Sequence, residues 1–230
     1  MPQENVRDQV NGSKKDPRKT AKICEYMSYS GREAFKRLRS NVLIGLPEKK
    51  EKGGRILGIT SAQASEGKST VTINLAYTLA ELGNTVLLGP GLSDVLLGKI
   101  NLNDSVVTYK STTDNTRFDI IAGGEIPDHP SELLNSTRFQ KLMEVVSSAY
   151  DYVILDLPPV GPVVDAVVVS KITEGLLVVI RENHCPRYAL DDCMEQLRYA
   201  KANILGFVLN GCVEGASKRY QYSQKYAYQA

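Results

Sequence analysis

The sequence predicts an α/β fold in which a mostly parallel sheet is flanked by helices on both faces. Two observations support this prediction. From residue 55 onward, apolar runs of strand length alternate with segments of helical spacing, an order typical of a parallel sheet covered by helices. Within that order, a Gly-Lys-Ser-Thr sequence at residues 67–70 separates a strand from a helix, and an apolar strand ends in Asp156. Ligands of such sheets bind at the carboxyl ends of the strands.

The chain divides into four segments. Residues 1–28 are polar and basic without periodicity, which predicts a disordered arm. Residues 29–54 are expected to form an N-terminal helical extension and a charged, glycine-ending linker, because Phe35, Leu38 and Val42 recur at helical spacing. Residues 55–215 form the main α/β domain. Residues 216–230 form a tail rich in tyrosine.

Composition narrows the class of protein. The chain has 230 residues, 42% of them apolar, and a net charge of only +2, which fits one domain and gives no global argument for binding nucleic acid. The four cysteines show no C-x-x-C spacing, so we expect reduced thiols in the cytoplasm. No apolar run reaches the length of a membrane span, so a partner would have to hold the protein at a membrane.

The loop before the helix expected at residues 71–82 has the chemistry of a phosphate-binding P-loop. Backbone N–H groups at a helix N-terminus attract anions, Lys68 can reach the β- and γ-phosphates, and the Ser69 hydroxyl can bind Mg²⁺. Ala62 stands where the usual G-x-x-x-x-G-K-[ST] pattern has its first glycine. The alternative is a serine-rich turn that only caps a helix. The predicted nucleotide-binding residues here are Ser65, Glu66, Gly67, Lys68, Ser69 and Thr70.

The remaining elements follow from periodicity and turn residues. Strands are expected at residues 55–60, 85–88, 118–121, 152–156, 176–180 and 204–209. Helices are expected at residues 30–43, 71–82, 92–98, 130–134, 165–169 and 188–200, with a further apolar stripe through Phe139, Leu142, Met143 and Val146.

Three polar residues mark strand ends or helix starts in this order. Asp156 ends a buried strand, the pattern of a Walker-B aspartate that holds Mg²⁺, although a cap of the following turn is the alternative. With Lys68 it forms the predicted catalytic pair. Asn210 ends the last strand, where its amide can bind an adenine edge or serve only as a turn residue before a glycine. Asp165 is expected to cap a short helix.

The tail concentrates tyrosines. Four of the chain's 12 tyrosines lie in its last eleven residues, interleaved with Lys and Gln. An edge strand is one interpretation, but a terminal segment without an apolar face favours flexibility. A flexible tyrosine tail beside a phosphate-binding site indicates phosphoacceptors, which would be Tyr220, Tyr222, Tyr226 and Tyr228.

Together these segments resemble the bacterial tyrosine kinases that govern capsule and exopolysaccharide synthesis, in the split form whose kinase is separate from its membrane chain. The resemblance runs from about Tyr29 to the C-terminus. It rests on the tyrosine tail and on residues 33–41, 66–70, 91–98, 130–134, 154–159 and 206–211.

The resemblance implies a fold akin to the partition ATPases, ATP and magnesium as ligands, and autophosphorylation of tail tyrosines between subunits of a homo-oligomeric ring. It implies that Glu33, Lys36 and Arg39 form the oligomerisation motif, with Lys36 in place of the family's arginine, and that residues 55–215 are a kinase domain. It also implies an activating partner, the cytoplasmic tail of a transmembrane polysaccharide co-polymerase, which recruits the protein to the inner face of the cell membrane.

The chain departs from the family after Leu88. There the family has a second acidic motif, whose aspartates serve magnesium and the tyrosine hydroxyl, whereas this chain passes through Gly89 and Pro90 directly to Gly91. Phosphoryl transfer depends on such positioning groups. The alternative function is therefore a nucleotide-binding but catalytically impaired relative that docks on its partner or accepts phosphate. A partition-type ATPase is a third hypothesis, which leaves the tyrosine tail unexplained.

Overall fold

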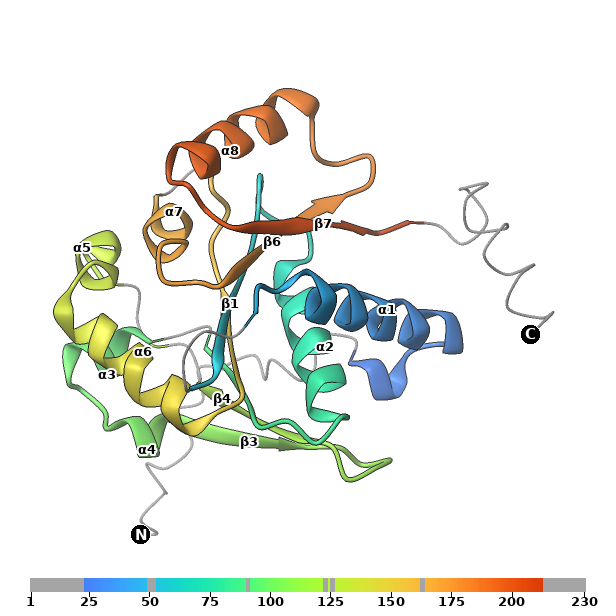
Figure 1. Ribbon diagram of the computed structural model, residues 1–230, viewed down its shortest axis with the longest axis horizontal. Coiled ribbons are helices and arrows are strands. Elements are labelled where there is room, and N and C mark those ends of the chain that lie inside the picture. Colours follow the sequence, from blue (N-terminus) through green and yellow to red (C-terminus); the bar gives the residue numbers. More distant parts are fainter. Residues whose placement is uncertain are drawn as a thin grey trace, which may run out of the picture.

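Figure 1 shows the computed structural model of the chain, which describes residues 23–48, 53–89, 92–121, 124, 127–161 and 164–212. Within these residues, seven strands form one sheet in the order β3-β4-β2-β5-β1-β6-β7. Only β3 runs antiparallel, along β4, so the sheet is mostly parallel as predicted. The strands are β1 (Arg55–Ser61), β2 (Val86–Leu88), β3 (Val106–Lys110), β4 (Arg117–Ile121), β5 (Tyr152–Asp156), β6 (Gly175–Arg181) and β7 (Ile204–Asn210).

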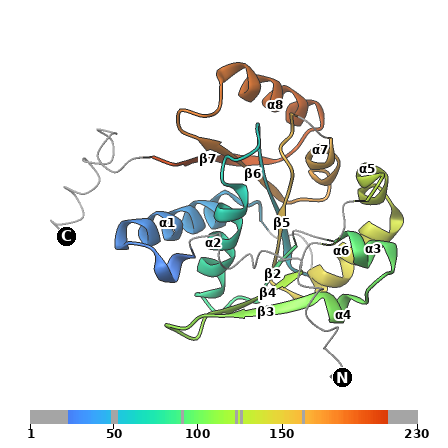
Figure 2. The same cartoon turned by 180° about the vertical axis from the view of Figure 1, so that it is seen from behind.

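Helices cover both faces of the sheet, as predicted (Figure 1; Figure 2). One face packs against the short 3-10 helix η2 (Cys24–Tyr26), α1 (Tyr29–Gly45) and α2 (Lys68–Ala80). The other packs against α3 (Ser93–Leu97), α5 (Pro130–Leu134), α6 (Thr137–Ala149), α7 (Asp165–Val169) and α8 (Arg187–Tyr199). The remaining helix, α4 (Leu102–Ser105), leads into β3.

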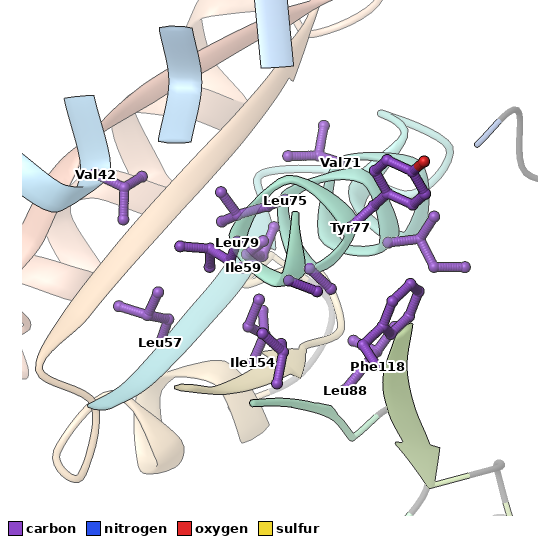
Figure 3. Packing of buried hydrophobic residues seen from close by; sticks show 14 of the residues in the cluster. Val42, Leu57, Ile59, Val71, Leu75, Tyr77, Leu79, Leu88, Phe118 and Ile154 are labelled. Atoms are coloured by element: carbon purple, nitrogen blue, oxygen red, sulfur yellow. The ribbon is translucent and has the colours of Figure 1, made fainter. Parts of the chain in front are cut away.

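The central strands are buried on both faces, which explains their continuous apolar sequences. In β5, Ile154 faces α1 and α2, whereas Val153 and Leu155 belong to the core on the opposite face. Figure 3 shows Leu75 and Leu79 of α2 directed toward the β1 and β5 strands. This packing fixes α2 directly behind β1, so the loop between them is held at the carboxyl end of the sheet.

Helix α1 is the predicted N-terminal helical extension. Its N-cap Ser28 accepts a hydrogen bond from the N–H of Gly31, and the predicted stripe of Phe35, Leu38 and Val42 packs against α2 and the sheet. Residues 23–28, assigned from the sequence to a disordered arm, are instead ordered. Ile23 and Cys24 are buried in the core beside α1, and this apolar contact offsets the entropy of ordering the segment.

Candidate functional site

The loop between β1 and α2 has the backbone of an anion-binding turn. Gly67 is the N-cap of α2 and has a φ of 91°, a left-handed conformation that favours glycine. A β-carbon at this position would lie 2.0 Å from Nδ2 of Asn210, so the Asn210 amide would have to leave its place on the loop to admit a larger residue. Ser65 and Glu66 lie in the loop, and residues 68–70 begin the helix. The N-terminus of α2 therefore presents unpaired N–H groups and a positive dipole end at this loop.

Lys68 places its ammonium beside the loop. Its Nζ donates a 3.1 Å hydrogen bond to Oγ of Ser61, at the end of β1. Burial lowers the pKa of Lys68, while Asp156 and Glu66 act in the opposite direction by stabilising its charge. The lysine is thus a half-buried cation next to a helix N-terminus, an arrangement that attracts phosphate groups.

Ser69 and Asp156 meet across two elements. Their register explains this contact, because Asp156 at the end of β5 pairs with Ile59 of β1, just before the loop. Oγ of Ser69 donates a 2.6 Å hydrogen bond to Oδ2 of Asp156. Burial raises the pKa of Asp156, although hydrogen bonding to Ser69 and the charge of Lys68 lower it in part.

The Ser69 and Asp156 oxygens fit a magnesium ion. Oδ1 of Asp156 is buried and has no hydrogen-bond partner among the described residues, so it is an orphaned acceptor beside the Ser69 hydroxyl. Hydroxyl and carboxylate oxygens are the ligands that Mg²⁺ prefers, and this ion usually takes only one or two carboxylates with phosphates and water. The part of the chain that the structure describes has no cluster of three or more His, Cys, Asp or Glu suited to a metal.

Asn210 lies at the carboxyl end of β7, beside the phosphate-binding loop. Its Nδ2 donates a 2.9 Å hydrogen bond to the carbonyl oxygen of Glu66. The sequence left its role open between adenine contact and a turn residue. In the structure its amide N–H serves the loop backbone, a third role that strand position alone did not suggest.

An open cavity of about 240 Å³ adjoins Asp156. Its wall is mostly apolar and includes Leu96 of α3 and Phe139 of α6. Asp165 also lines the cavity, and Oγ of Ser131 donates a 2.8 Å hydrogen bond to its Oδ1, which joins α5 to α7. The site therefore combines a polar phosphate end with an adjoining apolar space.

The predicted oligomerisation residues divide into two environments. Glu33 and Lys36 form a surface ion pair of 3.3 Å, with both side chains about 40% exposed. Arg39 is only 13% exposed and bonds within the chain, to the carbonyl of Thr78 at 2.6 Å and to Glu81 at 3.1 Å. Glu33 and Lys36 are thus accessible to another subunit, whereas Arg39 joins α1 to the end of α2.

Several functional candidates were missed by the sequence analysis. Ser61, Arg181 and His184 all contact the phosphate-binding loop or Lys68. Arg181 ends β6, so the rule that ligands lie at carboxyl strand ends would have found it. His184 had no such signal. The four predicted acceptor tyrosines of the tail lie outside the described residues.

Comparison with known proteins places the chain among kinases. It is 30% identical over 204 residues to tyrosine-protein kinase CpsD of Streptococcus agalactiae serotype Ia, covering 80% of this chain and 84% of that protein. It is 29% identical over 208 residues to tyrosine-protein kinase YwqD of Bacillus subtilis, covering 83% and 85%. The solved kinase domain of Escherichia coli tyrosine kinase ETK matches with a TM-score of 0.72 at 32% identity, over 82% of this chain and 78% of that one. No protein-family model matches.

Fold and site together define a P-loop protein of the α/β class, in which a strand, a glycine-containing loop and a helix carry Lys68 and Ser69 opposite Asp156. Within that class, the chain belongs to the bacterial tyrosine-protein kinases, a family of transferases. None of the helices in the described residues has the length and hydropathy needed to cross a membrane.

Proposed function

We propose that this chain is an ATP- and magnesium-dependent protein-tyrosine autokinase that regulates capsular or exopolysaccharide synthesis. The observation that carries the proposal is the convergence of Lys68, Ser69 and Asp156 at one loop, in a chain related to tyrosine kinases over most of its length. A cation, a hydroxyl and a half-buried carboxylate beside a helix N-terminus are the groups that bind a nucleotide phosphate with its metal.

Each residue has a defined task in this proposal. The N–H groups of the loop and the Lys68 ammonium bind the β- and γ-phosphates, and Ser69 and Asp156 hold Mg²⁺. When bound, that ion supplies positive charge against the charge that develops on the phosphates. Transfer forms a bond between a tyrosine oxygen and the γ-phosphorus and breaks the bond from that phosphorus to the β–γ bridging oxygen, which leaves with ADP. The hydroxyl proton passes to solvent.

The acceptors in this proposal are Tyr220, Tyr222, Tyr226 and Tyr228 of a neighbouring copy in a ring. The apolar cavity beside Asp156 supports it, since an aromatic ring fits such a space next to the phosphate end of the site. The exposed pair of Glu33 and Lys36 is available to the next subunit of that ring.

The proposed partner is a transmembrane polysaccharide co-polymerase. Its cytoplasmic tail would activate the kinase and recruit it from the cytoplasm to the inner face of the cell membrane. The partner follows from the family resemblance, and CpsD and YwqD, which align with the chain over more than four fifths of their own length, support the kinase part of this assignment.

A mixing experiment tests transfer between copies. One protein carries Phe at the four acceptor positions, and the other carries Lys68→Ala with an intact tail. After incubation with Mg-ATP, phosphotyrosine is expected on the Lys68→Ala chain, because the first protein supplies the site and the second the acceptors. Absence of phosphotyrosine on that chain, with phosphorylation of the unmodified protein alone, would contradict transfer between copies.

A second candidate function is favoured by the short connection after β2. This strand ends at Leu88 and α3 begins at Ser93, so residues 89–92 alone join them. The second acidic motif expected by resemblance has no room there. On this alternative the chain binds nucleotide but transfers no phosphate. Mg-ADP binding that is lost in Lys68→Ala, without any phosphotyrosine, would identify it.

A further inference from the structure

Three consecutive carbonyl groups of the phosphate-binding loop accept hydrogen bonds from side chains far away in the sequence. Nε2 of His184 donates to Ala64 at 3.1 Å, and Nη1 of Arg181 donates to Ser65 at 3.2 Å. Nδ2 of Asn210 donates to Glu66 at 2.9 Å. The donors come from the end of β6, the loop after it and the end of β7, which lie beside the β1–α2 loop (Figure 1; Figure 2). One side of the loop is therefore bound along its length.

The side chain of Glu66 strengthens the same attachment. It is fully buried, and its Oε2 accepts a 2.8 Å hydrogen bond from the N–H of Gln63. Its Oε1 faces the N–H of Arg181 at 3.4 Å. Burial, together with Glu66 itself, raises the pKa of the neighbouring Cys185 thiol to about 11, so this thiol is neutral and adds no repelling charge. The buried carboxylate thus links the loop to β6.

The loop contains a strained residue where Arg181 binds. Ser65 has a φ of 62°, a left-handed conformation that is unfavourable for residues other than glycine. Such conformations persist only where surrounding contacts hold them. Arg181 supports the Ser65 conformation through two contacts: its guanidinium donates to the Ser65 carbonyl, and its backbone N–H points toward the Glu66 carboxylate.

The geometry of the peptide bond determines which way the N–H groups of this loop point. In a planar trans peptide the C=O and the following N–H point in opposite directions. Because the carbonyls of residues 64–66 are turned toward β6 and β7, the N–H groups of residues 65–67 are turned away from them. Among the described residues, no group accepts a hydrogen bond from these three N–H groups. They are available to an anion.

We propose that Arg181 and His184 are positioning residues, which orient the loop amides toward phosphate without touching the nucleotide themselves. This inference rests on the proposed nucleotide site and adds two residues to it. Its occupant is the β-phosphate of a nucleoside diphosphate or triphosphate.

The test compares Arg181→Ala with Arg187→Ala, a matched control whose arginine is 94% exposed and, within the described part of the chain, pairs only with Asp191 on the surface of α8. The dissociation constant of Mg-ADP is measured by calorimetry, and the melting temperature is measured without nucleotide. Arg181→Ala is expected to raise the dissociation constant about tenfold, because a charge-assisted hydrogen bond is lost, with little change in melting temperature. Arg187→Ala is expected to bind as the unmodified protein does.

Conservative variants of Arg181 and His184 test whether the hydrogen-bond donor itself is needed. Arg181→Lys is expected to restore part of the affinity, and His184→Gln, which keeps a donor, is expected to bind more tightly than His184→Ala. An unchanged dissociation constant in Arg181→Ala, or a lower melting temperature with unchanged affinity, would overturn the inference. If Arg181→Ala does not fold, the Mg-ADP affinity of His184→Ala is measured in its place. A weaker affinity supports the inference, and an unchanged affinity overturns it. The experiment measures nucleotide binding alone, so its result does not depend on whether the protein forms phosphotyrosine. This inference and the proposed kinase activity can therefore fail separately.

Discussion

The hydroxyl of Ser69 donates a 2.6 Å hydrogen bond to Oδ2 of Asp156, which joins the first turn of α2 to the end of β5. This contact brings together two parts of the chain that are 87 residues apart. Because the other oxygen of Asp156 is buried without a partner among the described residues, a cation bound here would satisfy it. The pair is the structural basis of the proposed magnesium site.

Replacing Asp156 with asparagine keeps the size of the side chain and removes its charge. We expect the affinity for Mg-ADP to fall about tenfold or more, because a charged ligand of the ion is lost. Affinity for ADP without magnesium is expected to stay equal or to rise, since a negative charge beside the phosphates is gone. Calorimetry with and without Mg²⁺ measures both, with the exposed Asp192→Asn as control. Equal losses with and without magnesium would contradict the assignment.

The raised pKa of Asp156 predicts a pH dependence of binding. A protonated carboxyl cannot bind a cation, so magnesium-supported ADP affinity should decline as pH falls through a pKa that burial holds above 3.8. The effect on folding has the opposite sense. Because burial in the folded state favours the protonated carboxyl, the contribution of Asp156 to folding stability is fully present below the ordinary pKa of aspartate. It is lost as the pH rises through the raised pKa of the folded state. Affinities of the unmodified protein and of Asp156→Asn are compared between about pH 8 and about pH 5. Parallel curves would show that another group titrates.

Gly67 is expected to be irreplaceable for two reasons that can be separated. Gly67→Ala combines left-handed strain with a β-carbon 2.0 Å from Nδ2 of Asn210. Gly83→Ala has the same kind of strain, with a φ of 86°, but its β-carbon meets nothing within 4 Å. Both should lose about 1 kcal/mol of stability to strain, but only Gly67→Ala should abolish Mg-ADP binding. Thermal melting and calorimetry measure the two effects, and retained binding in Gly67→Ala would refute this role of the loop.

Replacements of Arg39 and of Lys36 are expected to have different effects, although the family resemblance implies that both belong to one oligomerisation motif. Arg39→Ala should destabilise the folded subunit by about 1–3 kcal/mol, because it removes a part-buried hydrogen bond to Thr78 and an ion pair with Glu81. Lys36→Ala removes only a surface pair, with a loss of about 0–1 kcal/mol, and should act on ring formation instead. Denaturant unfolding and sedimentation measure stability and assembly. Equal stability losses would contradict this division.

The sequence predicted the centre of the fold because its strands are buried on both faces. In β1 and β5 burial requires continuous apolar residues, and the next polar residue then marks the strand end, as Asp156 does. The edge strand β3 was missed, since only Tyr109 of its five residues is buried and no continuous apolar run marks it. The ordered segment around Ile23 was missed because it is too short to show periodicity.

Spacing along the sequence identified only the part of the site that is local in the chain. Lys68, Ser69 and Asp156 carry a local pattern of strand, loop and helix, so sequence spacing identified them. Arg181 and His184 contact loop carbonyls 116 and 120 residues away, and no spacing rule connects positions so distant. The position of Arg181 at the carboxyl end of β6 was an available signal, whereas His184 had none. Arg39 differs from these residues, since the family resemblance implied an oligomerisation role for it and the structure shows intrachain partners, Thr78 and Glu81.

The measurement that tests the proposed kinase activity most directly is the intact mass of the protein after incubation with Mg-ATP and the cytoplasmic segment of its membrane partner. A parallel sample carries Lys68→Ala. The proposal predicts phosphate adducts on the unmodified protein that map to the tyrosines between Tyr220 and Tyr228, and none on Lys68→Ala. Nucleotide binding without any adduct would contradict it, and would leave a relative of the tyrosine kinases that binds nucleotide but transfers no phosphate.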